Sequence, residues 1–299
     1  MCEGTYAEPL NLTTALQNTY RNCVNLDDEL HDLKVLAGIN TVVTAVGTGV
    51  GVGAVATGFA KERTDKEIAE MEKYLQELNV AAQQQTDEPT RVNITDDEIH
   101  ALFADEDTEY ITTEQEMEKL TKKSKNLGNW RTGLIATNTA TNIAGAIIAN
   151  KSKVNKDLQT LIDKCIDSVK ELNNSIVAAK MNNEDITEAQ QIYAACREYE
   201  YIDLSPINKR ATGAMVATSV GAVVGGVGTI TSGVANSDKI RNDNTDAGKK
   251  KEKDLNTASN VLAIGATAAS ATATVFNATQ IAAIKKVAKI SEACTGVLK

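Results

Sequence analysis

The sequence predicts an all-α protein in which two long antiparallel helical hairpins pack through small-residue faces into a four-helix bundle. The 299 residues include 3 Pro, 1 Trp and 3 Phe, and aromatic residues make up 4% of the chain. A chain so poor in bulky side chains cannot build an ordinary sheet-based core, so helices rich in Ala, Val, Ile and Leu are the default. The second observation is a set of four uncharged runs in which small residues recur at every fourth position.

Residues four apart lie on one face of a helix, so each run offers a shallow groove to a neighbouring helix. We expect the close contacts between helices at the centres of the four runs. The helix-packing residues predicted in this way are Gly49, Gly53, Thr141, Gly145, Gly221, Gly225, Thr267 and Ala271.

The first hairpin is expected at residues 10–182. A capping box at Thr14 and Gln17 predicts a helix from Thr14 to about Ala82, and a second box at Thr113 and Glu116 predicts a helix that runs to about Ala179. The acidic, Gln-rich residues 83–112 would form the tip. Heptad spacing over 68–82 and 117–127 predicts that this hairpin extends as a coiled-coil stalk.

The stalk is expected to meet the bundle at a joint. A break near Arg63 and Thr64 would face a second break over residues 126–129, because the two positions lie opposite each other in the hairpin. Trp130, the single tryptophan, is expected to plug this joint.

The second hairpin is expected at residues 183–299. A short linking helix from about Glu184 to Tyr199 precedes Ser205, which is a good N-cap, with Pro206 at the first helical position. This helix should run to about Lys239. The polar residues 240–250 read as the tip, and the last helix is expected over about 250–297.

The cysteines test the hairpin register. If the uncharged runs pack antiparallel in two pairs, Cys23 faces Cys165 and Cys196 faces Cys294 to within about one helical turn. Each pair would then close the open end of a hairpin as a disulfide. The alternative is four buried free thiols.

Several features predict an exported protein, in the periplasm, in the cell envelope or secreted. Thr5, Tyr6 and Ala7 before Glu8 look like the last residues of a signal peptide, so residues 1–9 are interpreted as a leader remnant or a disordered N-terminus. Without Cys2 the cysteine number is even, as expected for disulfides in an oxidising compartment.

The uncharged runs leave two environments open. Residues 35–60, 211–237 and 255–284 exceed the length that crosses a bilayer, and 132–150 just reaches it. Amides such as Asn138 and Asn277 argue against lipid, because an unpaired polar group there is costly. A soluble bundle is therefore favoured over a membrane-inserted one.

The composition excludes several functions. A net charge of -9 argues against nucleic-acid binding, and only two histidines and no Cys-x-x-Cys motif are present. We predict no catalytic, cofactor-binding or metal-binding residues, no cofactor and no small-molecule substrate.

Three stretches, NLGNWRTGLIATNTATNIAGAIIA, RATGAMVATSVGAVVGG and FNATQIAAIKK, resemble predicted exported Gly/Ala-rich helical proteins of host-associated Alphaproteobacteria, which have no assigned function. The likeness covers most of the chain after Glu8. It implies a leader peptide ahead of the first residue and brings no activity, ligand or catalytic residue.

The sequence thus predicts a non-enzymatic exported helical protein with a structural or interaction role, whose partner is an unknown protein or a second copy. The alternative is a membrane-inserting or pore-forming protein that uses the Gly-rich segments.

Overall fold

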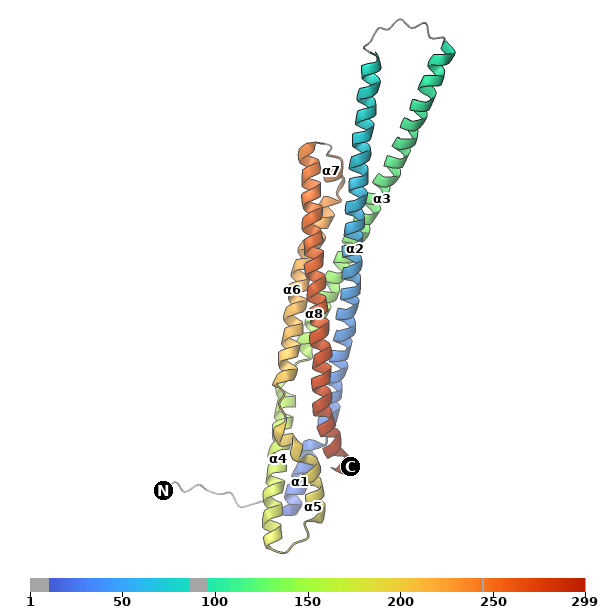
Figure 1. The fold of residues 1–299 in the computed structure, drawn as a ribbon. Helices are drawn as coiled ribbons and strands as arrows, with labels where there is room; N and C mark the ends of the chain where they lie inside the picture. Colours follow the sequence, from blue (N-terminus) through green and yellow to red (C-terminus); the bar gives the residue numbers. More distant parts are fainter. Residues whose placement is uncertain (1–10, 87–95, 244, 299) are drawn as a thin grey trace. The chain divides into compact units, whose positions relative to one another are not determined.

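The computed structural model describes residues 11–86, 96–243 and 245–298, without the side chains of 78–112 (Figure 1). Within these ranges the chain is helical and has no strand, which confirms the all-α prediction. The elements are α1 (Leu12–Cys23), α2 (Leu26–Thr86), α3 (Asp96–Lys151), α4 (Lys156–Met181), α5 (Thr187–Cys196), the 3-10 helix η1 (Arg197–Tyr201), α6 (Ser205–Ala235), α7 (Asp238–Arg241) and α8 (Asp246–Leu298).

The helices form two compact units. Unit 1 consists of the described residues up to Val46, of Thr141–Val220 and of the described residues from Ala269 onward. Unit 2 consists of the described residues of Gly47–Ala140 and Gly221–Ala268. Helices α2, α3, α6 and α8 contribute to both units, so each unit contains parts of both predicted hairpins.

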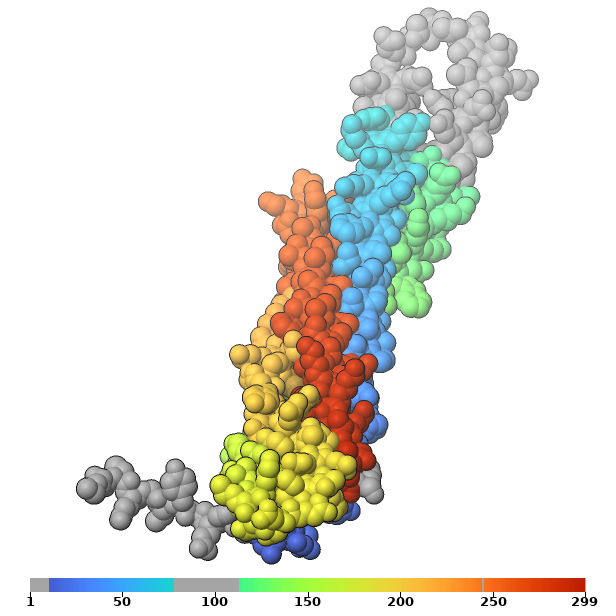
Figure 2. All heavy atoms as spheres, turned by 60° about the horizontal axis from the view of Figure 1, so that its bottom comes forward, coloured from blue at the N-terminus to red at the C-terminus, as the bar shows by residue number. Residues whose placement is uncertain are grey.

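In unit 1, α4 packs against α1, α5 and η1. Figure 2 shows yellow α5 beside the red carboxyl-terminal part of α8. Large aliphatic side chains such as Leu30, Ile162, Leu172 and Ile207 fill the core of this region, together with the ring of Tyr199. We call this region, with its two cysteine pairs, the disulfide-linked end.

Two predicted helices are each divided into two helices in the structure. Asn11 accepts a hydrogen bond from the Thr13 amide and starts α1, which ends at Cys23 before α2 begins. Asn155 accepts from the Leu158 amide at 2.7 Å and starts α4, so the helix expected to continue to Ala179 is two helices. Asparagine satisfies the free amides of a helix N-terminus, which favours the starts of α1 after Asn11 and of α4 after Asn155.

Other predicted ends and breaks are wrong. Helix α3 begins at Asp96, so Thr113 lies inside it, and α2 and α3 run without interruption through the expected joint. Thr64 hydrogen-bonds to the carbonyl of Ala60 within α2. A Cβ at Gly128 would collide with Asn236, so this glycine serves close packing and not a break.

The second half is closer to expectation. Helix α6 begins at Ser205, but the carboxylate of Asp203 accepts from the Ser205 amide at 2.8 Å and supplies the cap. It ends at Ala235, before the expected Lys239, and α8 starts at Asp246. The predicted leader remnant at residues 1–9 and residues 87–95 of the predicted tip lie outside the described residues, whereas the rest of that tip is helical.

Candidate functional site

Along the uncharged stretches of α2, α3, α6 and α8, successive buried residues are alternately four and three positions apart. The pattern is clearest in α6, where the buried residues are Ile207, Ala211, Ala214, Thr218, Gly221, Gly225, Gly228, Ser232 and Ala235. This is heptad spacing, which keeps a seam facing its neighbours. A strict four-residue stripe advances around the helix with every step and leaves the contact surface.

This difference decides which predicted packing residues make contacts in unit 2. Gly221 and Gly225 are buried, and Gly53 and Thr267 are half-buried. Gly49 is exposed, and a Cβ there would meet nothing within 4 Å. The prediction for Gly49 is therefore wrong, because it lies on the four-residue stripe where that stripe has turned toward the surface.

In unit 1, the predicted packing residue Gly145 lies where neighbouring helices approach closely. A Cβ at Gly145 would lie 3.0 Å from the methyl group of Thr218 and 3.1 Å from that of Thr44. Thr141 and Ala271 are half-buried beside this seam. Close approach here depends on the absence of a side chain.

Amides and hydroxyls fill the seam of unit 1. Asn40 donates to the Oδ1 atom of Asn277 at 2.9 Å, and Asn277 donates to the hydroxyl of Thr44 at 3.3 Å. Ser270 donates to Asn142 at 3.0 Å. All five residues are buried, so hydrogen bonds between helices accompany the contacts of buried alanines along this seam.

The seam of unit 2 is also polar or small. The hydroxyls of Thr132 and Ser232 lie 2.7 Å apart, and Ser259 donates to the Gly228 carbonyl at 3.2 Å. Ile135 is the one large aliphatic side chain buried in the described uncharged stretches of this unit.

The outer faces of the same stretches carry Val, Ile and Phe. In unit 1 these exposed residues are Val35, Ile39, Val42, Val46, Ile143, Ile147, Val216, Val220, Val275 and Phe276. In unit 2 they are Val52, Phe59, Val223, Val227, Ile230, Val234, Val261 and Ile264. Along the uncharged stretches of α2, α6 and α8, both units thus place the larger apolar side chains outside and small or polar ones inside.

Buried cations mark the edge of these stretches in unit 2. Lys61 is buried and contacts Asp65 at 2.6 Å and Glu252 at 3.3 Å. Arg131 is also buried and donates to the carbonyl of Asn256 at 3.0 Å. Burial lowers the pKa of Arg131 to about 10, and the charge of Asp65 opposes that shift.

Aromatic side chains lie at the same edge. Trp130 is 70% exposed, so its predicted role as a plug is wrong. Phe59, two residues before Lys61, is exposed as well. The heptad places Arg131 on the buried seam of α3, which turns its neighbour Trp130 outward.

Both predicted cysteine pairs lie at disulfide distance in unit 1. The Cα atoms of Cys23 and Cys165 are 4.9 Å apart, and those of Cys196 and Cys294 are 4.5 Å apart. Each pair joins segments that are far apart in the sequence.

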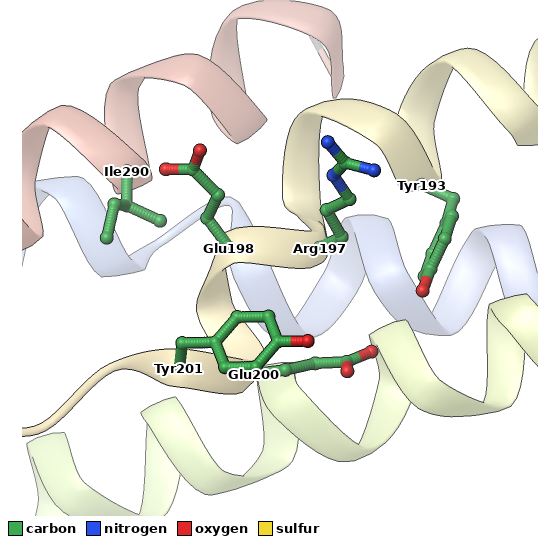
Figure 3. A pocket seen from close by; sticks show the side chains of 6 residues that line it. All are labelled: Tyr193, Arg197, Glu198, Glu200, Tyr201 and Ile290. Atoms are coloured by element: carbon green, nitrogen blue, oxygen red, sulfur yellow. The ribbon is translucent and has the colours of Figure 1, made fainter.

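A hollow of about 550 Å³ lies at the surface of the disulfide-linked end (Figure 3). Figure 3 shows the charged ends of Arg197 and Glu198 pointing away from Glu200 and Tyr201. Arg197, Glu198 and Tyr201 are exposed. The charged groups that line the hollow therefore face solvent and do not converge on a common point.

Sequence reasoning missed the residues that make the seam polar at its ends. Gln280 is buried and donates to the Ser152 carbonyl at 2.7 Å, and Asn40 joins α2 to α8. Their heptad spacing from Asn277 and Thr44 could have identified them.

Comparisons with protein-family models, curated proteins and solved structures found no match.

Proposed function

We propose that this chain is a non-enzymatic exported protein whose uncharged helix stretches insert into a lipid bilayer as two antiparallel hairpins packed into a four-helix bundle. The observation that carries the proposal is the inverted polarity of these stretches. Their seams hold amides, hydroxyls and small residues, and their outer faces hold Val, Ile and Phe.

The disulfide-linked end supplies an internal comparison. Its core is aliphatic, as expected for helices that bury an apolar face away from water. Along the uncharged stretches of the same unit the arrangement is reversed. In a bilayer, small and polar residues mediate helix contacts because lipid tails offer no hydrogen bonds and solvate Val and Ile well.

Helix length is compatible with insertion. Within the described residues, three stretches are long and apolar enough to cross a membrane, and they lie in Leu12–Glu77, Ser205–Ala235 and Asp246–Leu298. Helix α6 has 31 residues, or about 46 Å of length, against a hydrocarbon thickness of about 30 Å. The uncharged stretch of α3 is shorter and richer in Thr and Asn.

The edge residues in unit 2 also support a membrane boundary. Trp130 and Phe59 are exposed aromatic side chains where the uncharged stretches end, and aromatic residues favour the headgroup region.

The two cysteine pairs favour an oxidising compartment and hence export. The filled seams favour a closed bundle over an open pore.

Trp130 provides a direct test, because it is the single tryptophan of the chain. The protein, purified in mild detergent, is diluted onto phosphatidylcholine vesicles and floated on a density gradient. We expect it to float with the lipid, and we expect Trp130 emission to shift to shorter wavelength. Lipids brominated near the headgroup should quench it more than lipids brominated deep in the chains.

A matched pair of variants tests the outer face. Val223 and Ile230 are 69% and 70% exposed on α6, whereas Met181 is 79% exposed at the end of α4. Changing both Val223 and Ile230 to Lys should weaken vesicle binding by more than about 100-fold, because a lysine inside the hydrocarbon costs roughly 3 kcal/mol. Met181→Lys should leave binding unchanged. Flotation of the double variant equal to wild type would contradict insertion.

A further inference from the structure

We propose that unit 1 carries a basic collar that binds the anionic headgroups of the membrane into which the protein inserts. The collar consists of the cations in the first helical turn beyond the uncharged stretches. These residues are Lys34, Lys151, Lys153, Lys209, Arg210, Lys285 and Lys286. The inference rests on the proposed insertion and specifies its lipid class.

The collar stands out against the charge of the chain. The whole protein has a formal net charge of -9. Within the same helical turn, Asp32 is the one acidic residue that accompanies the seven cations. Clusters of Lys and Arg directly beside membrane-embedded helices attract anionic lipids.

Hydrogen bonds within unit 1 place the four helix segments that carry the collar at similar positions along the seam. Gln280, five residues before Lys285, donates to the carbonyl of Ser152 at 2.7 Å. Asn208, next to Lys209, accepts from the amide of Val154 at 2.8 Å. Asn40 of α2 bonds to Asn277 of α8 at 2.9 Å. The collar therefore forms around the helix seam.

The collar cations are available to a ligand. Lys151, Lys209, Lys285 and Lys286 are exposed. Within the part of the chain that the structure describes, no collar cation lies within ion-pair distance of a carboxylate. Lys153 has its Nζ atom 3.6 Å from the sulfur of Met215. The positive charge of the collar is thus not neutralised by the protein itself.

In unit 2, the first helical turn beyond the uncharged stretches carries more acidic residues. Glu62, Asp238, Glu252 and Asp254 accompany its cations. Lys61 pairs with Glu252 at 3.3 Å, and Asp238 pairs with Lys125 at 3.2 Å. That turn holds seven cations and four acidic residues in unit 2, against seven cations and one acidic residue in unit 1. The stronger preference for anionic lipid therefore belongs to unit 1.

The cysteine pairs identify the leaflet. They lie in unit 1 with the collar, which places the collar on the oxidising side of the membrane. Basic flanks normally mark the cytoplasmic side of proteins inserted during synthesis. Basic residues beside disulfides are the reverse arrangement, and they fit a protein that approaches an anionic leaflet from the oxidising side.

The test uses the oxidised full chain with vesicles of phosphatidylcholine alone or mixed with phosphatidylglycerol. We expect tighter binding to the mixed vesicles and a loss of this preference in high salt. Changing both Lys285 and Lys286 to Glu should weaken binding to mixed vesicles by at least about tenfold, since each cation contributes about fivefold. A second pair, Lys151→Glu with Lys209→Glu, should behave alike.

The control variant changes Lys164 and Lys180 to Glu, which alters the net charge equally on the exposed surface of α4. It should bind mixed vesicles like wild type. If wild type binds both vesicle types equally, or if control and collar variants lose the same affinity, the proposed headgroup binding by the collar is contradicted. The proposed insertion is not affected by that outcome. If wild type binds neither vesicle, the proposed insertion fails as well.

Discussion

Glycine has two different consequences on these helices, and the difference lies in where each Cα faces. Gly145 lies on the seam of unit 1, where a side chain would collide with Thr44 and Thr218. Gly49 and Gly133 face open space. At the surface a glycine only weakens the helix, by roughly 0.5–1 kcal/mol relative to alanine.

The first prediction follows from this contrast. Gly145→Leu should lower the free energy of unfolding by several kcal/mol, because an overpacked seam must separate. Gly49→Ala and Gly133→Ala should each raise it by up to about 1 kcal/mol. Chemical denaturation followed by helical circular dichroism measures all three. Equal effects at Gly145 and Gly49 would show that the heptad seam is not the contact surface.

Tyr199 gives a pH dependence at the residue scale. Its side chain is fully buried, and burial raises its pKa to about 12, with a smaller rise from the charge of Asp27 and an opposing effect of Ser291. The unfolded phenol has a pKa of about 10. Since the folded state holds the proton more tightly, stability is intact below pH 10 and falls as pH rises toward 12.

The second prediction is that Tyr199→Phe removes this alkaline loss, which amounts to roughly 2–3 kcal/mol. Near neutral pH the same variant should differ from wild type by no more than about 1 kcal/mol. Tyr201→Phe is the control, because Tyr201 is 83% exposed. Unfolding is followed at several pH values from neutral to strongly alkaline. Identical alkaline profiles for wild type and Tyr199→Phe would contradict the assignment.

At the scale of elements, the sequence predicted which segments are helical better than where they end. The uncharged runs have no strand-forming alternation and little Pro, so helix is the consistent interpretation. The starts of α1 and α4 depend on single asparagines, Asn11 and Asn155, and many similar residues lie inside helices. Asn126 and Asn129, for example, lie within α3 without ending it.

The seam was harder to predict because two periodicities overlap in the sequence. Glycines such as Gly221 and Gly225 belong both to a four-residue stripe and to the heptad. Only packing against other helices selects the heptad, which retains Gly228 and Ser232 and leaves Gly233 at the surface. The register of the hairpins nevertheless placed all four cysteines in their correct pairs.

The third prediction concerns those pairs. Replacing Cys23 and Cys165 by Ser should cost about 2–5 kcal/mol and increase amide hydrogen exchange chiefly in α1 and α4. The pair Cys196→Ser with Cys294→Ser should instead loosen α5 and the carboxyl-terminal part of α8. Each double variant is the control for the other. The same exchange pattern in both would show that the two links do not hold separate elements.

For the molecule as a whole, the sequence did not decide whether the uncharged helices turn their apolar or their polar side chains outward. Asn277 and Thr44 in a run argue against lipid when their direction is unknown, because their cost depends on a partner. Once they pair with each other inside the seam, the same residues become compatible with a bilayer. Composition supplied the apolar length, and only the fold could show which side chains face outward.

The fourth prediction tests this surface in the absence of lipid. Exposed Val and Ile along α2, α6 and α8 form apolar faces that water does not solvate well, so the protein should self-associate in detergent-free buffer. Mild detergent should return it to the monomer. The Val223→Lys, Ile230→Lys double variant should reduce association without detergent, whereas Met181→Lys should not. Light scattering coupled to size-exclusion chromatography measures the masses, and a wild-type monomer in plain buffer would show that these faces need no lipid.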